Sequence, residues 1–226
     1  MPTHSTAHPL KIAILVSGQS RGSNMQSLIE DCKSELSIAA VGVVIGTRSD
    51  SRALERARES NIQTTVVSPI KKTAAGDVEN SDYGATLLRI LRKYEIGLIC
   101  LAGYMRILPP MVVEEFENRI MNIHPALLPL FGGKGMYGEN VHKAVLESGM
   151  KIAGCTVHFV DHHYDNGPII MQTVVPVLDE DEFGDLAARV LKAEHETYPK
   201  AVQLFAQNRL QVQGRKVKIL TDAPAD

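Results

Sequence analysis

The feature that most constrains the fold is a repeated alternation between short apolar runs and segments with helical periodicity. Residues 10–17 (LKIAILVS) form a continuous apolar run that ends at Gly18, which is typical of a buried strand. Further strands are expected at 38–46, 64–68, 96–103 and 119–124, and helices at 23–33, 51–60, 83–94 and 110–116. Strands that alternate with helices predict an α/β fold with a doubly wound, mostly parallel sheet.

The pattern changes after residue 124. Two β-rich runs, at 153–160 and 169–177, follow each other without a helix between them, so we expect antiparallel strands in the C-terminal portion of the sheet. A long helix over 182–208 should kink or break near Pro199. Loops are expected at 69–81 and 125–138, a short helix at 140–147, a disordered tail at 1–9, a single domain over 10–210 and a C-terminal extension at 211–226.

Charge and cysteine content limit the classes of function. The formal net charge of −2 gives no electrostatic reason to expect nucleic acid or an anionic membrane as a partner. No apolar stretch reaches the roughly 18 residues of a membrane span, and residues 1–9 lack the apolar core of a secretory signal. The three cysteines lack CxxC spacing, which suits a reducing compartment, so we expect a cytoplasmic protein.

The turn after the first strand, SGQSRGSN at 17–24, is the first candidate site. A glycine-rich turn that leads from a strand into a helix presents free backbone N–H groups and favours an anion such as phosphate. The spacing of Gly18 and Gly22 fits neither GxGxxG nor GxxxxGK[ST], so neither a dinucleotide nor a P-loop is indicated. The alternative is a tight turn with a helix cap.

The second candidate is NIHPALLP at 122–129. Asn122 and His124 share one face of an expected strand and stand at its carboxyl end, where ligands bind in open α/β folds. The histidine could move a proton near neutral pH, and the asparagine amide could donate to a developing oxyanion. A structural role for the histidine is the alternative.

The third candidate, TVHFVDHHYDNGPII at 156–170, holds the densest group of titratable residues. No HExxH or CxxC frames it, so we expect no metal site. We interpret Asp165 as a carboxylate held close to a partner histidine, and His162 and His163 as solvated loop residues.

The fourth signal is Glu194, whose spacing from its apolar neighbours puts it on the buried side of the last helix. A buried charge is costly unless it is paired or used. Glu194 could bind an amine, although a structural salt bridge explains it equally well.

From Lys11 to Arg209 the chain resembles the glycinamide ribonucleotide formyltransferases of the folate-dependent formyltransferase superfamily. Five motifs occur in the family's order: SGxxxxGSN, LAGYMRIL, NIHPALLP, VHFVDHHYDNGPII and AEH. The resemblance implies a Rossmann-like formyltransferase fold, a cytoplasmic enzyme of de novo purine synthesis, 10-formyltetrahydrofolate as co-substrate, and a monomer or homodimer.

The resemblance also implies roles for matching positions. The implied catalytic set is Asn122, His124 and Asp165; the phosphate loop is Gly22, Ser23 and Asn24; the amine carboxylate is Glu194; and the folate pocket is Met105, Arg106, Ile107, Leu108 and Val160. Three departures concern the loops: two extra residues in the phosphate loop, a longer segment at 131–142, and Asn80 where some relatives have a basic residue.

Four other classes of protein share some of these features. Methionyl-tRNA formyltransferase normally carries a further C-terminal domain, and formyltetrahydrofolate hydrolase a further N-terminal domain, neither of which is expected here. An NADP-dependent oxidoreductase could place Arg48 on a 2′-phosphate, but the glycine spacing disfavours it. A non-catalytic folate-binding protein would not need the intact set of polar residues.

Overall fold

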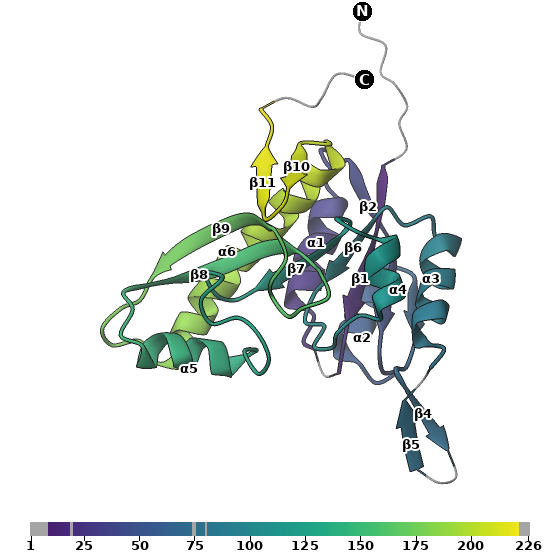
Figure 1. The fold of residues 1–226 in the computed structure, drawn as a ribbon, viewed down its shortest axis with the longest axis horizontal. Helices are drawn as coiled ribbons and strands as arrows, with labels where there is room; N and C mark the ends of the chain where they lie inside the picture. Colours follow the sequence, from purple (N-terminus) through teal and green to yellow (C-terminus); the bar gives the residue numbers. More distant parts are fainter. Residues whose placement is uncertain (1–8, 19, 74–75, 80, 222–226) are drawn as a thin grey trace, which may run out of the picture.

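The computed structural model describes residues 9–18, 20–73, 76–79 and 81–221. They form a nine-stranded sheet with helices on both faces, and a small separate hairpin projects from one end of the molecule (Figure 1). The strands are β1 (Leu10–Val16), β2 (Ala39–Gly46), β3 (Thr64–Val66), β4 (Ile70–Thr73), β5 (Gly76–Glu79), β6 (Leu98–Leu101), β7 (Ile120–His124), β8 (Ile152–Phe159), β9 (Ile169–Pro176), β10 (Leu210–Gln213) and β11 (Lys216–Ile219). The helices are α1 (Ser23–Cys32), α2 (Arg52–Glu59), α3 (Tyr83–Lys93), α4 (Pro110–Glu115), α5 (Glu139–Glu147) and α6 (Phe183–Ala206).

The sheet has the order β10-β11-β9-β8-β7-β6-β1-β2-β3. Strands β1, β2, β3, β6 and β7 run parallel, whereas β8 is antiparallel to both β7 and β9. The predicted doubly wound sheet with an antiparallel C-terminal portion is therefore confirmed. The chain reverses its order between β1 and β6, which is where open α/β sheets bind ligands.

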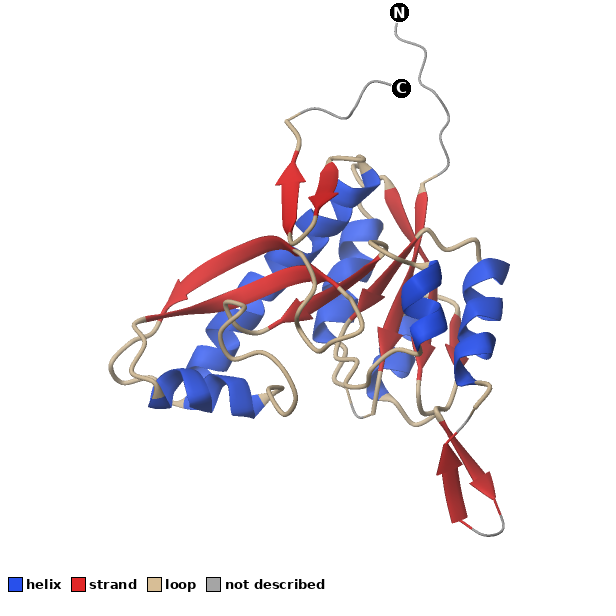
Figure 2. Ribbon diagram, in the orientation of Figure 1, coloured by secondary structure: helices blue, strands red, loops and turns tan. Residues whose placement is uncertain are grey.

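Two apolar cores lie on opposite faces of the sheet. Figure 2 shows the helices that cover these two faces. Alternate residues of β1 serve each core, because successive side chains of a strand point to opposite faces. Ile12 and Ile14 join the core formed with α1, α2 and α6, whereas Ala13 and Leu15 join the core formed with α3 and α4. Because apolar residues of the long helix α6 belong to the first of these cores, α6 is packed against the sheet.

Three details differ from the sequence predictions. The expected loop at 69–81 was wrong in part, because it contains the antiparallel pair β4–β5, which forms a sheet of its own. The sequence of this segment lacks the alternation of apolar and polar residues that predicts a half-buried strand. Of the kink or break expected near Pro199, the break is wrong, because α6 continues through Pro199. The expected boundary at residue 210 falls at the start of β10, and β10 and β11 continue the main sheet through residue 219.

Candidate active site

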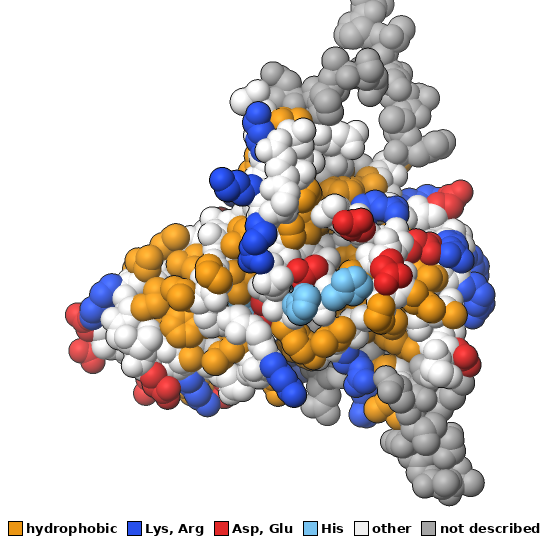
Figure 3. Space-filling model, viewed as in Figure 1, with side chains coloured by type: hydrophobic (Ala, Val, Ile, Leu, Met, Phe, Trp, Pro, Cys, Tyr) orange, Lys and Arg blue, Asp and Glu red, His pale blue; other side chains and the backbone are white. Residues whose placement is uncertain are grey.

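A cavity of about 970 Å³ opens at the carboxyl ends of β6 and β7, and we call it the main cavity. On the face of the molecule that Figure 3 shows, histidine side chains lie near the middle, between acidic side chains and apolar ones. Ten of the twelve site residues expected from the sequence line it: Asn24, Met105, Arg106, Ile107, Leu108, Asn122, His124, Val160, Asp165 and Glu194. The fold thus brings residues of all five motifs to one space.

Asn122 and His158 face each other across β7 and β8, where they are paired in register. The Asn122 amide nitrogen lies 3.2 Å from Nε2 of His158, and Nδ1 of His158 lies 2.7 Å from the carbonyl of Phe159. A carbonyl can only accept, so Nδ1 carries the proton and Nε2 accepts from the asparagine amide. Burial lowers the pKa of His158, which keeps this ring neutral. The orientation of the Asn122 amide is therefore fixed by a neutral histidine.

His124 is buried and lies between two oxygen acceptors. Its Nε2 lies 2.8 Å from the carbonyl of Phe131, and its Nδ1 lies 3.6 Å from Oδ1 of Asp165. The other carboxylate oxygen of Asp165 accepts a hydrogen bond from the Gly133 N–H at 2.9 Å. Both ring nitrogens of His124 therefore face oxygen atoms, one of a backbone carbonyl and one of a carboxylate. Oδ1 of Asp165 also lies 3.7 Å from Nε2 of His158, which brings one carboxylate close to both histidines, although the unprotonated Nε2 has no proton to donate to it.

Glu194 lies on α6 with only 6% of its surface exposed, as its helical spacing predicted. Its Oε2 accepts a hydrogen bond of 2.9 Å from the amide of Asn24, and none of the ion pairs among the described residues includes it. Burial raises the pKa of Glu194 to about 7, while the Asn24 hydrogen bond acts in the opposite direction. The carboxylate is thus poised for a cationic ligand.

The turn that the sequence predicts as a phosphate loop places Gly22 at the cap of α1 in the left-handed conformation, with φ of 73°. A Cβ at Gly22 would lie 2.8 Å from the Cβ of Ala53, so both geometry and space require glycine there. No side chain of the described residues caps this end of the helix, which leaves its N–H groups available for an anion.

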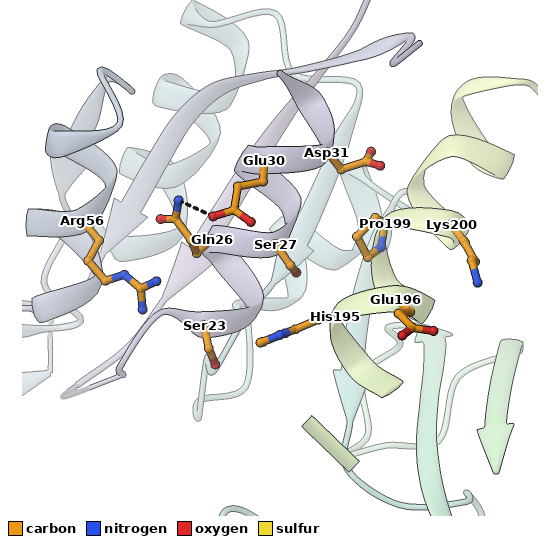
Figure 4. Close-up of a pocket in the computed structure, with 10 residues that line it drawn as sticks. All are labelled: Ser23, Gln26, Ser27, Glu30, Asp31, Arg56, His195, Glu196, Pro199 and Lys200. Carbon is orange, nitrogen blue, oxygen red and sulfur yellow. Dashed lines mark hydrogen bonds between the residues drawn. The ribbon is translucent and has the colours of Figure 1, made fainter. Parts of the chain in front are cut away.

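Ser23 does not line the main cavity but a second pocket of about 610 Å³ between α1, α2 and α6, which we call the α1–α6 pocket. In Figure 4 the side chains of Arg56 and His195 extend toward the N-terminal end of α1, where Ser23 lies. Nε2 of His195 is buried and has no hydrogen-bond partner among the described residues. A basic side chain, an imidazole and a helix N-terminus together fit an anionic group.

The segment after β6 forms the apolar wall of the main cavity. The Ser17 hydroxyl accepts a 2.8 Å hydrogen bond from the Met105 N–H and donates to the Gly103 carbonyl, which ties the segment to β1. Met105 and Ile107 are each 52% exposed, whereas Leu108 is buried. Half-exposed apolar side chains beside a cavity suit an aromatic ligand. Asn80, the third departure noted in the sequence, lies outside the described residues.

The residues of the main cavity to which the sequence assigned no role include Tyr104, His142 and His158. His158 belongs to the group of titratable residues at 156–170, but only the register of β8 against β7 reveals its contact with Asn122.

Within the described part of the chain, no cluster of histidine, cysteine and acidic side chains could hold a metal ion. Cys32, Cys100 and Cys155 are free thiols. No described helix has both the length and the apolar composition of a membrane span.

Comparison with known proteins places the chain in a class. Residues 10–202 match the family model described as "Formyl transferase". The chain therefore belongs to the formyl transferase family.

Individual relatives narrow the similarity. The chain is 41% identical to "Phosphoribosylglycinamide formyltransferase, chloroplastic" of Vigna unguiculata over 91% of this chain and 64% of that protein. It is 36% identical to "Phosphoribosylglycinamide formyltransferase" of Escherichia coli (strain K12) over 90% of each chain. The solved structure of glycinamide ribonucleotide transformylase 1 from Symbiobacterium toebii matches with a TM-score of 0.85 and 41% identity, covering 97% of this chain and 98% of that one. The chain spans less than two thirds of the length of the Vigna relative.

Proposed function

We propose that this protein transfers a formyl group from 10-formyltetrahydrofolate to the amino group of glycinamide ribonucleotide, giving formylglycinamide ribonucleotide and tetrahydrofolate, in de novo purine synthesis. The observation that supports this most strongly is the composition of the main cavity. It combines a hydrogen-bonded Asn122–His158 pair and a His124–Asp165 pair with Glu194, a buried carboxylate without an ion-pair partner among the described residues. An acid–base cluster beside an unpaired buried carboxylate suits a reaction at an amine.

In this proposal, Asn122, His124 and Asp165 act on the formyl group. As the amine attacks the formyl carbon, negative charge develops on the formyl oxygen, and the Asn122 amide and a protonated His124 would stabilise it. Asp165 would hold the positive charge on His124, since an opposite charge nearby favours the cation. The attacking nitrogen then loses a proton and the carbonyl re-forms. The bond between the formyl carbon and the folate nitrogen breaks as that nitrogen takes up a proton from His124 or through a water. No covalent intermediate with the protein is needed.

The co-substrate fits the remaining walls of the main cavity. Met105, Ile107, Leu108 and Val160 supply apolar surface, and Arg106 supplies a cation for the glutamate tail of the folate. A volume of about 970 Å³ lies at the upper end of the range for small-molecule sites. The cavity is therefore large enough for two small substrates to meet.

The phosphate of the acceptor would bind at the N-terminal end of α1. Gly22 and Ser23 form this end, and Arg56 and His195 border the adjoining α1–α6 pocket. Asn24, which follows Ser23 on α1, borders the main cavity together with Glu194. An acceptor could therefore place its phosphate in the α1–α6 pocket and its amine in the main cavity.

Hydrolysis of the formyl folate is the second candidate, because the same catalytic set could activate water. A structure of a formyltetrahydrofolate deformylase from Pseudomonas syringae shares the fold, with a TM-score of 0.81 at 21% identity. Glu194 favours the transferase, since water needs no buried carboxylate as a partner.

An optical assay of folate release, with and without glycinamide ribonucleotide, separates the two functions. We expect release only when the acceptor is present. Release at the same rate without acceptor would instead establish a hydrolase.

We also propose a cytoplasmic location, in keeping with the three free thiols, and a monomeric or dimeric state. Cell fractionation tests the location, and light scattering tests the oligomeric state.

A further inference from the structure

The side chain of Asn24 connects the start of α1 to the middle of α6 inside the main cavity. Its Nδ2 donates to Oε2 of Glu194 at 2.9 Å. Its own oxygen, Oδ1, is buried and has no hydrogen-bond partner among the described residues. If the amide were rotated by half a turn, Oδ1 would oppose a carboxylate oxygen, so Glu194 itself fixes the orientation of the amide.

Two acceptor atoms are left over by this contact. No hydrogen bond among the described residues reaches Oε1 of Glu194, and none reaches Oδ1 of Asn24. Oδ1 of Asn24 is a buried acceptor without a partner among the described residues, which is costly, and both residues line the main cavity. A ligand group with several N–H donors, such as an amine, satisfies both atoms.

We propose that Asn24 is a positioning residue for the amine site, whose Nδ2 holds Oε2 of Glu194 so that Oε1 of Glu194 and Oδ1 of Asn24 receive the N–H groups of the acceptor. This inference rests on the proposed function, because it concerns the amine that is to be formylated. It gives the Asn24 side chain a task other than phosphate binding, which falls to the backbone of the loop and to Ser23.

A neutral amide suits this task better than a lysine or arginine would. A cation would pair with Glu194 permanently and compete with the amine, whereas an amide orients the carboxylate and leaves its charge uncompensated. Near neutral pH the carboxylate of the free protein is only partly ionised, because burial raises the pKa of Glu194 to about 7. The amine would then favour the ionised form on binding.

Other titratable groups share these surroundings. Cys155 on β8 senses the charge of Glu194, although burial is the main reason that the pKa of this thiol is raised to about 11. Histidines 124, 142 and 158 and Asp165 line the same cavity. A pH profile of one variant therefore needs a matched control.

The chain offers such a control. Nε2 of Gln203 on α6 donates to Oδ2 of Asp31 on α1 at 2.6 Å, so a second amide–carboxylate hydrogen bond joins the same two helices, and Gln203 does not line the main cavity. If Asn24 only clamps the helices together, Asn24→Ala and Gln203→Ala should behave alike.

The test compares Asn24→Ala, Gln203→Ala, Glu194→Gln and the double variant Asn24→Ala/Glu194→Gln in the full chain. We measure KM for glycinamide ribonucleotide and kcat from pH 6 to 9, the Kd of folate, and Tm.

For Asn24→Ala we expect KM to rise roughly ten- to a hundredfold at pH 7 and folate affinity to stay unchanged. The increase in KM should become smaller toward higher pH. Gln203→Ala should lower Tm alone. In the double variant the Asn24→Ala change should add little to Glu194→Gln, as coupled residues do in a double-mutant cycle.

Additive effects in the cycle would overturn the proposal. So would an Asn24→Ala effect that disappears with the dephosphorylated acceptor, because it would assign Asn24 to phosphate. If Asn24→Ala does not fold, Asn24→Asp replaces it; a second carboxylate should move the acidic limb of the pH profile upward. Absence of formyl transfer in the wild-type protein would refute the proposed function instead, and binding of the amine measured by calorimetry would still test the role of Asn24.

Discussion

Asp165 and His124 face each other in the main cavity, with Oδ1 of the carboxylate 3.6 Å from Nδ1 of the imidazole. The opposite nitrogen of His124 is fixed by the carbonyl of Phe131, and the second oxygen of Asp165 by the Gly133 N–H. The loop after β7 therefore holds both partners. Asp165 itself adopts a left-handed backbone conformation with φ of 49°, which aspartate tolerates better than most residues.

Asp165→Asn should lower kcat by roughly 10²- to 10⁴-fold, the range for losing proton-transfer catalysis, because the charge that supports a protonated His124 is removed. Binding of both substrates should stay near normal, since the effect arises mainly in the transition state. Steady-state kinetics, calorimetry and Tm on one preparation check this.

Asp161→Asn is the control for the same loop. Asp161 accepts hydrogen bonds from the His163 N–H and the Asn166 amide, and no hydrogen bond or ion pair among the described residues joins it to His124. It should lose about 1 kcal/mol of stability and keep its turnover. Equal kinetic losses in the two variants would show that Asp165 only shapes the loop.

Ser23→Ala should weaken binding of glycinamide ribonucleotide roughly ten- to a hundredfold, because a hydrogen bond to a charged phosphate contributes about 1.5–3 kcal/mol. Folate affinity should not change, since Ser23 borders the α1–α6 pocket rather than the main cavity. Ser34→Ala, beyond the other end of α1, serves as the control. Titration calorimetry that showed weaker folate binding would reverse the assignment of the two subsites.

Glu194→Gln should stabilise the ligand-free protein in a pH-dependent manner. Because the pKa of Glu194 is raised from 4.5 to about 7, the folded protein retains a proton that the unfolded chain has released between these values. The free energy of unfolding of the wild type therefore falls as pH rises through this window. We expect the variant to gain about 3 kcal/mol relative to the wild type at pH 8 and almost nothing at pH 4.5. Urea unfolding at both pH values measures this, and an equal difference at both would contradict the raised pKa.

Cys155→Ala should keep kcat within about threefold of the wild type and lose roughly 1 kcal/mol of stability. Burial raises the pKa of the Cys155 thiol to about 11 and also raises the pKa of Cys100, so neither forms a thiolate at neutral pH. Loss of turnover in a folded Cys155→Ala protein would require a covalent step that our account lacks.

Local sequence patterns predicted most of the fold and most of the candidate site. The run of apolar residues in β1 and the spacing around Glu194 are local signals, and both led to the observed burial. The contact of His158 with Asn122 depends instead on the register of β8 against β7, and that of Asn24 with Glu194 on the packing of α1 against α6. Such contacts join residues 36 and 170 positions apart, so no local pattern contains them.

The central claim, formyl transfer to an amine, is tested most directly by following the formyl carbon itself. The protein is mixed in a single turnover with 10-formyltetrahydrofolate that carries a ¹³C-formyl group and with glycinamide ribonucleotide, and the products are separated by mass spectrometry. Our account predicts that the label appears on the ribonucleotide as formylglycinamide ribonucleotide and that His124→Gln abolishes its appearance. Recovery of the label as free formate, with the ribonucleotide unmodified, would contradict it.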